Sequence, residues 1–176
     1  LKKVITSKYT LNSNVSEIDS SIIKKYSLGL EDKIVFLDEK LLHYPQINGV
    51  KIFDFSDFEC RNNDAITELN SALAKSGFTI TIDKNTIVKS PIEILFFNST
   101  KNSFSQYRNQ ILVGENSQVK IVEKIQDLSD SSTLLNHFTH ITCSKNTKVE
   151  YNKIQNNTKD SKLIDCMNIF QEQDST

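Results

Sequence analysis

The chain has few of the residues that mark several common classes of protein. Its three cysteines, among 176 residues, stand at positions 60, 143 and 166, an odd number without close spacing. A disulfide framework would need an even, closely patterned set, so this count favours a reducing compartment. The four glycines form no glycine-rich phosphate-binding loop. We therefore expect a cytoplasmic protein that has no nucleotide-binding loop in this segment.

Long apolar runs and clusters of one charge are also missing. The longest apolar runs have about five or six residues, whereas a membrane-spanning helix needs about 20. The opening residues lack the pattern of a secretory signal. Acidic and basic residues, 22 and 21 in number, are interspersed and leave a net charge of −1. Because nucleic-acid binding needs clustered Lys and Arg, we expect neither a nucleic-acid partner nor a membrane partner.

A pattern that occurs three times is the main positive feature of the sequence. It runs from residue 80 to 88, from 111 to 119 and from 141 to 149, so the copies begin 31 and 30 residues apart. Each copy has alternating apolar residues, a short gap, Asn followed by Ser or Thr, and a β-branched residue. Asn tolerates the left-handed conformation of a sharp corner. A fixed period of this size indicates stacked coils that bury their apolar faces against one another.

The repeat predicts a mainly β protein with a parallel β-helix, or solenoid, over residues 78–176. Ile80, Ile111 and Ile141 then lie on one inner wall, and the polar segments 98–105 and 127–133 are loops between coils. The alternative is a β-sandwich, since evenly spaced short strands also suit that fold. The chain ends directly after a strand-like stretch without a polar cap, so we expect the core to be truncated there.

The residues before the repeat predict a small α/β appendage over residues 1–62. We expect a short amphipathic helix over 16–26 and strands over 33–38 and 50–55, with turns between the strands.

A clearer helix follows over residues 63–76, and we expect the segment 63–77 to cover the open end of the solenoid as a capping helix. Asn63 or Asp64 is suited to cap its first turn, and Gly77 to end it in a left-handed conformation. Its apolar stripe consists of Ile66, Leu69, Ala72 and Leu73.

His137, His140 and Cys143 are the first candidates for metal ligands. On one strand, residues 137 and 143 share a face but lie about 20 Å apart, and residue 140 faces the other way. One tetrahedral metal cannot reach all three. Cys143 occupies the repeat position of Ile82 and Val113, so we interpret it as a packed thiol. A metal-binding β-barrel is the alternative for the histidine pair, but only His43 remains as a further ligand.

No catalytic set is evident either. Cys60 and Cys166 have no basic residue arranged to activate a thiol. Carboxylate pairs of the glycosidase kind would have to come from Glu93, Glu115, Glu123 and Glu150. We interpret these acids as the solvated face of strands, together with the basic residues Lys120, Lys124, Lys145, Lys148 and Lys153. The residues alone thus predict a non-catalytic scaffold without catalytic, cofactor-binding or metal-binding residues.

The order of several segments resembles the SufB/SufD family of iron–sulfur cluster assembly proteins. The resemblance runs from about residue 33 and rests on a dispersed pattern: residues 33–38 and 48–52, the helix from Ala65, Gly77–Ile82, Lys89–Leu95, Arg108–Val119, Asn136–Ile141 and Val149–Gln155. SufB proteins carry an arginine-containing motif after the strand at 92–97. Here Phe97, Asn98 and Ser99 stand instead of that motif, so SufD is the more similar of the two.

The resemblance implies a right-handed parallel β-helix in a scaffold subunit. SufD-like proteins pair with a SufB-like paralogue and with a SufC-like ATPase, and the complex assembles and transfers iron–sulfur clusters. The cluster is transient at the level of the complex, and no functional residue of the family can be placed on this segment. A carbohydrate-active or adhesive β-helix protein is the alternative function, which would need an acidic cluster on consecutive coils.

Overall fold

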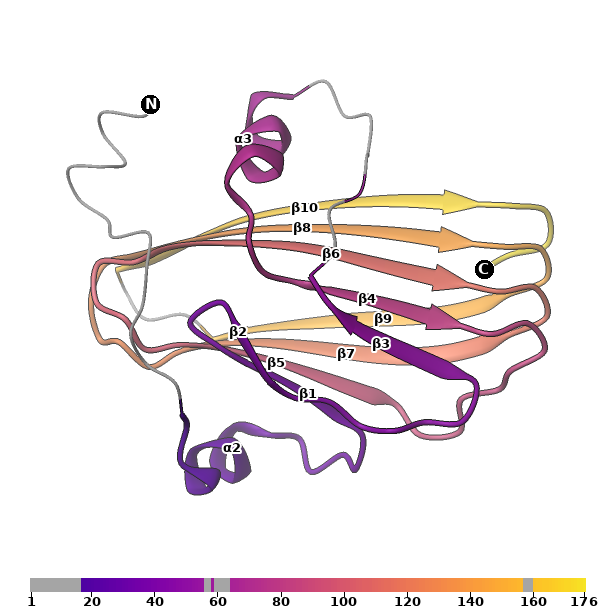
Figure 1. The fold of residues 1–176 in the computed structure, drawn as a ribbon, viewed down its shortest axis with the longest axis horizontal. Helices are drawn as coiled ribbons and strands as arrows, with labels where there is room; N and C mark the ends of the chain where they lie inside the picture. Colours follow the sequence, from indigo (N-terminus) through magenta and orange to yellow (C-terminus); the bar gives the residue numbers. More distant parts are fainter. Residues whose placement is uncertain (1–16, 56–57, 59–63, 157–159) are drawn as a thin grey trace.

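The computed structural model describes residues 17–55, 58, 64–156 and 160–176, and its ten strands form two sheets (Figure 1). One sheet has the order β2-β1-β5-β7-β9 and the other β10-β8-β6-β4-β3. The strands are β1 Lys33–Leu37, β2 Lys40–His43, β3 Val50–Asp54, β4 Phe78–Ile82, β5 Ile92–Asn98, β6 Phe104–Val113, β7 Gln118–Asp127, β8 Thr133–Cys143, β9 Lys148–Asn156 and β10 Ser161–Gln171. From β4 onward the chain alternates between the sheets, which makes a parallel β-solenoid of about 3 turns.

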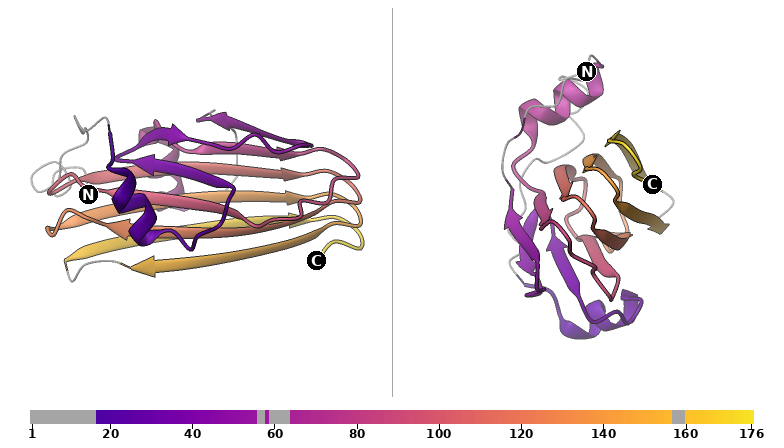
Figure 2. Two further views of the ribbon diagram at one scale, coloured as in Figure 1. Left: turned by 90° about the horizontal axis from the view of Figure 1, so that it is seen from below. Right: turned by 90° about the vertical axis from the view of Figure 1, so that its right-hand side faces the viewer.

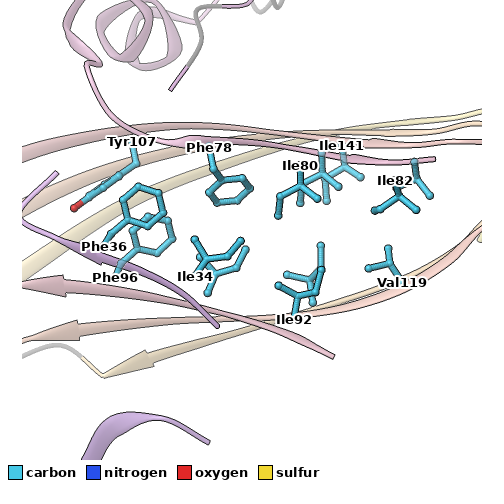
Figure 3. Packing of buried hydrophobic residues seen from close by; sticks show 14 of the residues in the cluster. Ile34, Phe36, Phe78, Ile80, Ile82, Ile92, Phe96, Tyr107, Val119 and Ile141 are labelled. Atoms are coloured by element: carbon cyan, nitrogen blue, oxygen red, sulfur yellow. The ribbon is translucent and has the colours of Figure 1, made fainter. Parts of the chain in front are cut away.

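The register between coils follows the sequence repeat. Ile80 of β4 is paired with Ile111 of β6, and Ile111 with Ile141 of β8. All three side chains lie in one buried core cluster, and Figure 3 shows Ile80 and Ile141 pointing into the interior from the same wall. The predicted solenoid is therefore confirmed, and the β-sandwich alternative is wrong, because sandwiches are built from antiparallel sheets.

The repeated asparagines form the corners of successive coils. Asn85, Asn116 and Asn146 have φ angles of 61°, 58° and 55°, in the left-handed region that the sequence predicts. Asn116 Nδ2 donates to Asn85 Oδ1 at 3.0 Å, and Asn146 Nδ2 donates to Asn116 Oδ1 at 2.8 Å. The ladder aligns one corner above the next, so it stabilises the register as well as the turn.

Aromatic side chains fill the interior of the first coils (Figure 3). The rings of Phe36 and Phe96 stack at 4.9 Å, and the ring of Tyr107 meets Phe96 edge-on at 4.6 Å. The ring of Phe78, on the facing sheet, has its centre 6.3 Å from the centre of the Phe36 ring. Each such ring removes a large apolar surface from water, so this layer anchors β1 against the repeated coils.

The segments before the repeat join the same two sheets. The predicted strands at 33–38 and 50–55 are confirmed as β1 and β3, while β2 was not predicted. β1 pairs with β5 in parallel and β3 pairs with β4 antiparallel. The division into an appendage over 1–62 and a core over 78–176 stays a prediction, and the structure adds that β1, β2 and β3 extend the sheets of the solenoid.

The short helix predicted near the N-terminus is α2, Ser20–Tyr26. The side chain of Asp19 accepts from Ser21 N at its start. The helix packs on the outer face of the sheet, where Val35, Leu95 and Phe97 form a second buried cluster. The outer face of this sheet is therefore partly covered.

The helix predicted over 63–76 is α3, Ala65–Leu73, and three details of the prediction are wrong. The helix contacts β6 and β8, on the outside of the middle of one sheet, and does not cover an end of the solenoid (Figures 1 and 2). Its buried side chains are Thr67 and Asn70, whereas the apolar stripe is only half-buried or exposed. Asn70 Nδ2 donates to two strand carbonyls, at 3.1 Å each, so polar contacts hold the helix.

The third difference is at the C-terminal end of α3, whereas its N-terminal cap agrees with the prediction. Asp64 caps its start, accepting from Ile66 N and Thr67 N, while the other predicted cap, Asn63, lies outside the described residues. The helix ends at Ala74 in extended conformation, so Gly77 is not its cap. A Cβ on Gly77 would lie 2.0 Å from the carbonyl oxygen of Arg108, so glycine is needed there for close backbone approach.

None of the helices in the described ranges has the length and apolar character to cross a bilayer.

Candidate functional site

The residues considered as metal ligands are separated by the fold. His137 and Cys143 lie on the inner face of β8, and Cys143 belongs to the core cluster, as its repeat position predicts. His140 is half-buried on the outer face, with Nε2 3.2 Å from Thr142 Oγ1. His43 is exposed on β2.

The described cysteines do not share a site either. Cys166 is in register with Phe138, on the outer face, and Cys60 lies outside the described residues. Across the described ranges, no group of three or more His, Cys, Asp or Glu residues is arranged to hold a metal ion. A ligand set for an iron–sulfur cluster is thus not found there, and the absence of a cofactor from this segment stays a prediction.

Two of the four glutamates lie on the solvated face, as predicted. Glu115 pairs with Lys84 at 2.5 Å, and Glu150 pairs with Lys120 at 3.0 Å. These lysines lower the pKa of both exposed carboxyls by hydrogen bonding and by their charge. Such surface pairs contribute little to stability.

The prediction is wrong for Glu93, which is fully buried. It points to the outer face of β5, and the segment that follows α2 covers it. Its carboxylate accepts from Ser27 Oγ and from Leu28 N, each at 2.6 Å. Glu93 therefore fixes the end of α2 to the sheet, an arrangement that strand periodicity alone cannot reveal.

The prediction is also wrong for Glu123, which is fully buried inside the solenoid. Lys153 Nζ lies 3.0 Å from Glu123 Oε1, and the hydroxyl of Tyr151 donates to Glu123 Oε2. His137 Nδ1 lies 3.7 Å from the same Oε1. Lys153 also binds Asp165 Oδ1 at 2.7 Å. We call these five residues, from β7, β8, β9 and β10, the interior ionic cluster.

Electrostatics keep the centre of this cluster charged. Burial opposes ionisation of Glu123, but contacts with His137, Lys153 and Tyr151 outweigh it and lower the pKa to about 2. Burial likewise opposes the charge on Lys153, but Glu123 and Asp165 raise its pKa above the ordinary value. Burial and the Glu123 charge raise the pKa of Tyr151, which stays a neutral donor. The cluster therefore holds a carboxylate and an ammonium ion in the interior.

The sequence does contain a signal for this cluster. Val119, Ile121 and Ile125 alternate on the inner face of β7, and Glu123 continues that alternation. Lys153 follows Val149 and Tyr151 in the same way on β9. The position of a residue in the alternation along a strand therefore indicates that its side chain points inward, even where its residue type favours solvent.

Sequence reasoning also missed a buried arginine under α3. Arg108 of β6 is buried, and its guanidinium lies 4.6 Å from the ring of Phe58 and 4.7 Å from that of Phe138. It donates to the carbonyl oxygen of Phe58 at 3.1 Å. Stacking between two aromatic rings suits the planar guanidinium. This contact ties Phe58 to the outer face of the sheet.

The comparison with protein families concerns the repeated coils. Residues 96–176, from β5 to the end of the chain, match the family model described as "SUF system FeS cluster assembly, SufBD core domain". The range begins later than the resemblance from residue 33 predicts, so the relation of residues 33–95 to this family stays a prediction. No curated protein matches the chain. Residues 96–176 therefore correspond to the SufBD core domain of the SUF system, and the match does not separate SufB from SufD.

Proposed function

We propose that this protein is a SufD-like scaffold subunit of a cytoplasmic SufBCD complex. In this role it pairs with a SufB-like paralogue and a SufC-like ATPase, and the complex assembles iron–sulfur clusters and transfers them to acceptor proteins. The cluster is the cargo of the complex, and this segment positions partners and has no catalytic turnover of its own.

The match of residues 96–176 to the SufBD core domain is the observation that carries this proposal. The interactions between the coils support a positional role. The coils are joined by three layers of interaction, namely parallel strand pairing, the corner asparagines and the interior ionic cluster. A solenoid held in this way is stiff, so it can keep partners at a defined separation.

The choice of SufD over SufB depends on one short stretch. Phe97, Asn98 and Ser99 stand where SufB proteins carry an arginine-containing motif. Phe97 packs beneath α2, and Asn98 is buried and accepts from Ser103 Oγ at 3.1 Å. These side chains serve the packing of this coil, which agrees with a structural subunit.

Co-purification tests the proposal. The tagged protein is co-expressed with the SufB-like and SufC-like proteins of its own source, and we expect a stable complex of all three that forms clusters with iron and sulfide and passes them to an apo-ferredoxin. Ile111→Asp should abolish the complex because it disrupts the core, whereas the exposed Lys120→Ala should not. Failure of the unaltered protein to bind either partner would refute the proposal.

The same preparation tests the carbohydrate-active or adhesive alternative. Binding or cleavage of polysaccharides without binding to the Suf partners would favour that alternative, which rests on the solenoid fold alone.

A further inference from the structure

The turn between β1 and β2 contains a glutamate at a position where glycine is favoured. Asp38 and Glu39 form the turn, with φ angles of 46° and 69°, and Leu37 is paired with Lys40 on its two sides. A two-residue hairpin turn with positive φ at both positions favours Asn or Asp first and Gly second. Asp38 fits that preference, but Glu39 stands where only glycine is free of strain. The formation of the turn therefore does not explain the presence of a glutamate.

The side chain of Asp38 fixes the first half of this turn to the loop after β5. Its carboxylate accepts from the backbone N–H and the hydroxyl of Ser99, and from Thr100 N at 3.0 Å. Hydrogen bonds to an ionised carboxylate are among the stronger ones in proteins. The first half of the turn is therefore anchored within its own sheet and loop.

Glu39 fixes the second half of the turn to the opposite sheet. Its Oε1 accepts from Gln106 N at 2.6 Å, and its own N–H donates to the hydroxyl of Tyr107 at 2.8 Å. Both partners belong to β6, whereas β1 and β2 belong to the other sheet. The side chain is half-buried, and in the part of the chain that the structure describes its carboxyl forms no ion pair. A carboxyl withdrawn from water without a counter-ion favours its neutral form.

The groups that face Glu39 leave this preference in place. Burial is the main reason that the pKa of Glu39 rises from 4.5 to about 7, and the charge of Asp38 adds to the rise. The Gln106 amide and the charge of Lys75, in the segment after α3, act in the opposite direction but are outweighed. Tyr107 stays neutral, because burial raises its pKa well above the ordinary value. While β2 is in place, the carboxyl of Glu39 is therefore neutral in mild acid and ionised in mild alkali.

β2 is the element that this carboxyl is able to release. It lies at the edge of its sheet, and in the described ranges it pairs with β1 alone, in an irregular register. Its four residues are half-buried or exposed, whereas all but the first residue of β1 are buried. Segments with few buried contacts open at a lower free energy than the core does. β2 can therefore detach while β1 stays in the sheet.

We propose that Glu39 is a pH-sensitive latch, which keeps β2 on the solenoid while its carboxyl is neutral and releases β2 when the carboxyl is ionised. Ionisation in place leaves a charge without a counter-ion, and release of the turn returns that charge to water. The proton passes to solvent. Release also uncovers the edge of β1, which is then open to pairing with another strand. This inference does not depend on the proposed scaffold function.

Hydrogen exchange of the whole chain, measured by mass spectrometry between pH 4 and pH 8, tests the latch. The released carboxyl has its ordinary pKa of 4.5 and the latched one a pKa of about 7, so β2 is held most firmly below pH 4.5 and opens more readily as pH rises to about 7. After correction for the intrinsic rate of exchange, the opening constant of β2 should rise by about 200-fold over the range. It should also exceed that of β6 at every pH. Equal opening constants in β2 and β6 would mean that β2 exchanges only when the whole chain unfolds, and would overturn the proposal.

Glu39→Gln distinguishes the latch from simple fraying of an edge strand. It removes the charge but keeps an oxygen that can accept from Gln106 N, so the opening constant of β2 should no longer depend on pH. Glu31→Gln, at an exposed position before β1, is the matched control and should keep the rise of about 200-fold. A rise that persists in Glu39→Gln would refute the latch.

Tyr107→Phe separates the carboxyl from the other contact that Glu39 makes with β6. It removes the hydroxyl that accepts from Glu39 N but leaves the carboxyl in place. The opening constant of β2 should therefore increase by a similar factor at pH 4 and at pH 8, and its dependence on pH should remain. Loss of that dependence in folded Tyr107→Phe would assign the response to the hydroxyl and would likewise overturn the proposal.

Discussion

The carboxyl group of Glu39 should make the stability of this protein depend on pH near neutrality. Glu39 lies in the tight turn between β1 and β2, where its backbone has a φ of 69°. Its Oε1 accepts from Gln106 N at 2.6 Å, and its own N–H donates to the hydroxyl of Tyr107 at 2.8 Å. Burial, with a smaller contribution from the charge of Asp38, raises its pKa from 4.5 to about 7, although the Gln106 amide and Lys75 oppose the change.

The direction of the effect follows from this pKa. Below pH 4.5 Glu39 is protonated in the folded and the unfolded chain, and it imposes no penalty. Between pH 4.5 and about 7 only the unfolded chain ionises fully, so its contribution to stability falls as pH rises. A tenfold change in acidity is worth about 1.36 kcal/mol, so the folded state loses up to about 3 kcal/mol above pH 7.

Glu39→Gln removes the charge but keeps an oxygen that can accept from Gln106. We expect its free energy of unfolding, measured by urea denaturation, to equal that of the unaltered chain at pH 4 and to exceed it by about 2–3 kcal/mol at pH 8. Glu31→Gln, at an exposed position before β1, is the control and should show no such difference. An equal effect of Glu39→Gln at both pH values would refute the reasoning.

Three further predictions concern stability, and denaturant unfolding measures each. Ile111→Ala should cost about 2–5 kcal/mol because it leaves a cavity in the fully buried wall, and a loss below 1 kcal/mol would contradict that packing. Gly77→Ala should cost at least about 3 kcal/mol, since its Cβ would meet a backbone carbonyl at 2.0 Å. Gly29→Ala, with open space around it and a φ of 82°, should cost only about 1–2 kcal/mol, and equal losses at the two glycines would argue against the close approach. Glu123→Gln should cost about 3 kcal/mol at pH 7. Because the pKa of Glu123 is lowered to about 2, the stability that its charge supplies is present above pH 4.5, and the difference should vanish as pH falls towards 2.

The repeated coils could be predicted from the sequence because each coil depends on the conformational preferences and polarity of residues that are close together in the chain. Alternation of apolar residues in Ile80–Ile82 and its two copies sets which side chains face inward. Asn85, Asn116 and Asn146 mark corners since Asn adopts the left-handed conformation more readily than most residues. The equal spacing of the two signals then sets the register between coils, and the structure confirms it.

The segments before the coils could be predicted less completely. For α3, the apolar stripe predicted the buried face, but the helix turns Thr67 and Asn70 towards the sheet and binds strand carbonyls through Asn70. The contacts that decide its position come from residues more than 35 positions away, as in the bond from Asn70 to the carbonyl of Tyr107. Helix periodicity does not encode such contacts.

The sequence by itself determined the solenoid, its inner wall and its corners, because all three depend on periodicity and on the conformational preferences of single residues. Only the tertiary structure decided the location of the charges. Glu93 is buried because α2 and the segment after it cover an outer face, and Glu123 is tolerated inside because Lys153, Tyr151 and His137 come from neighbouring coils. The free energy of a buried charge depends on partners brought together by folding, and those partners are distant in sequence.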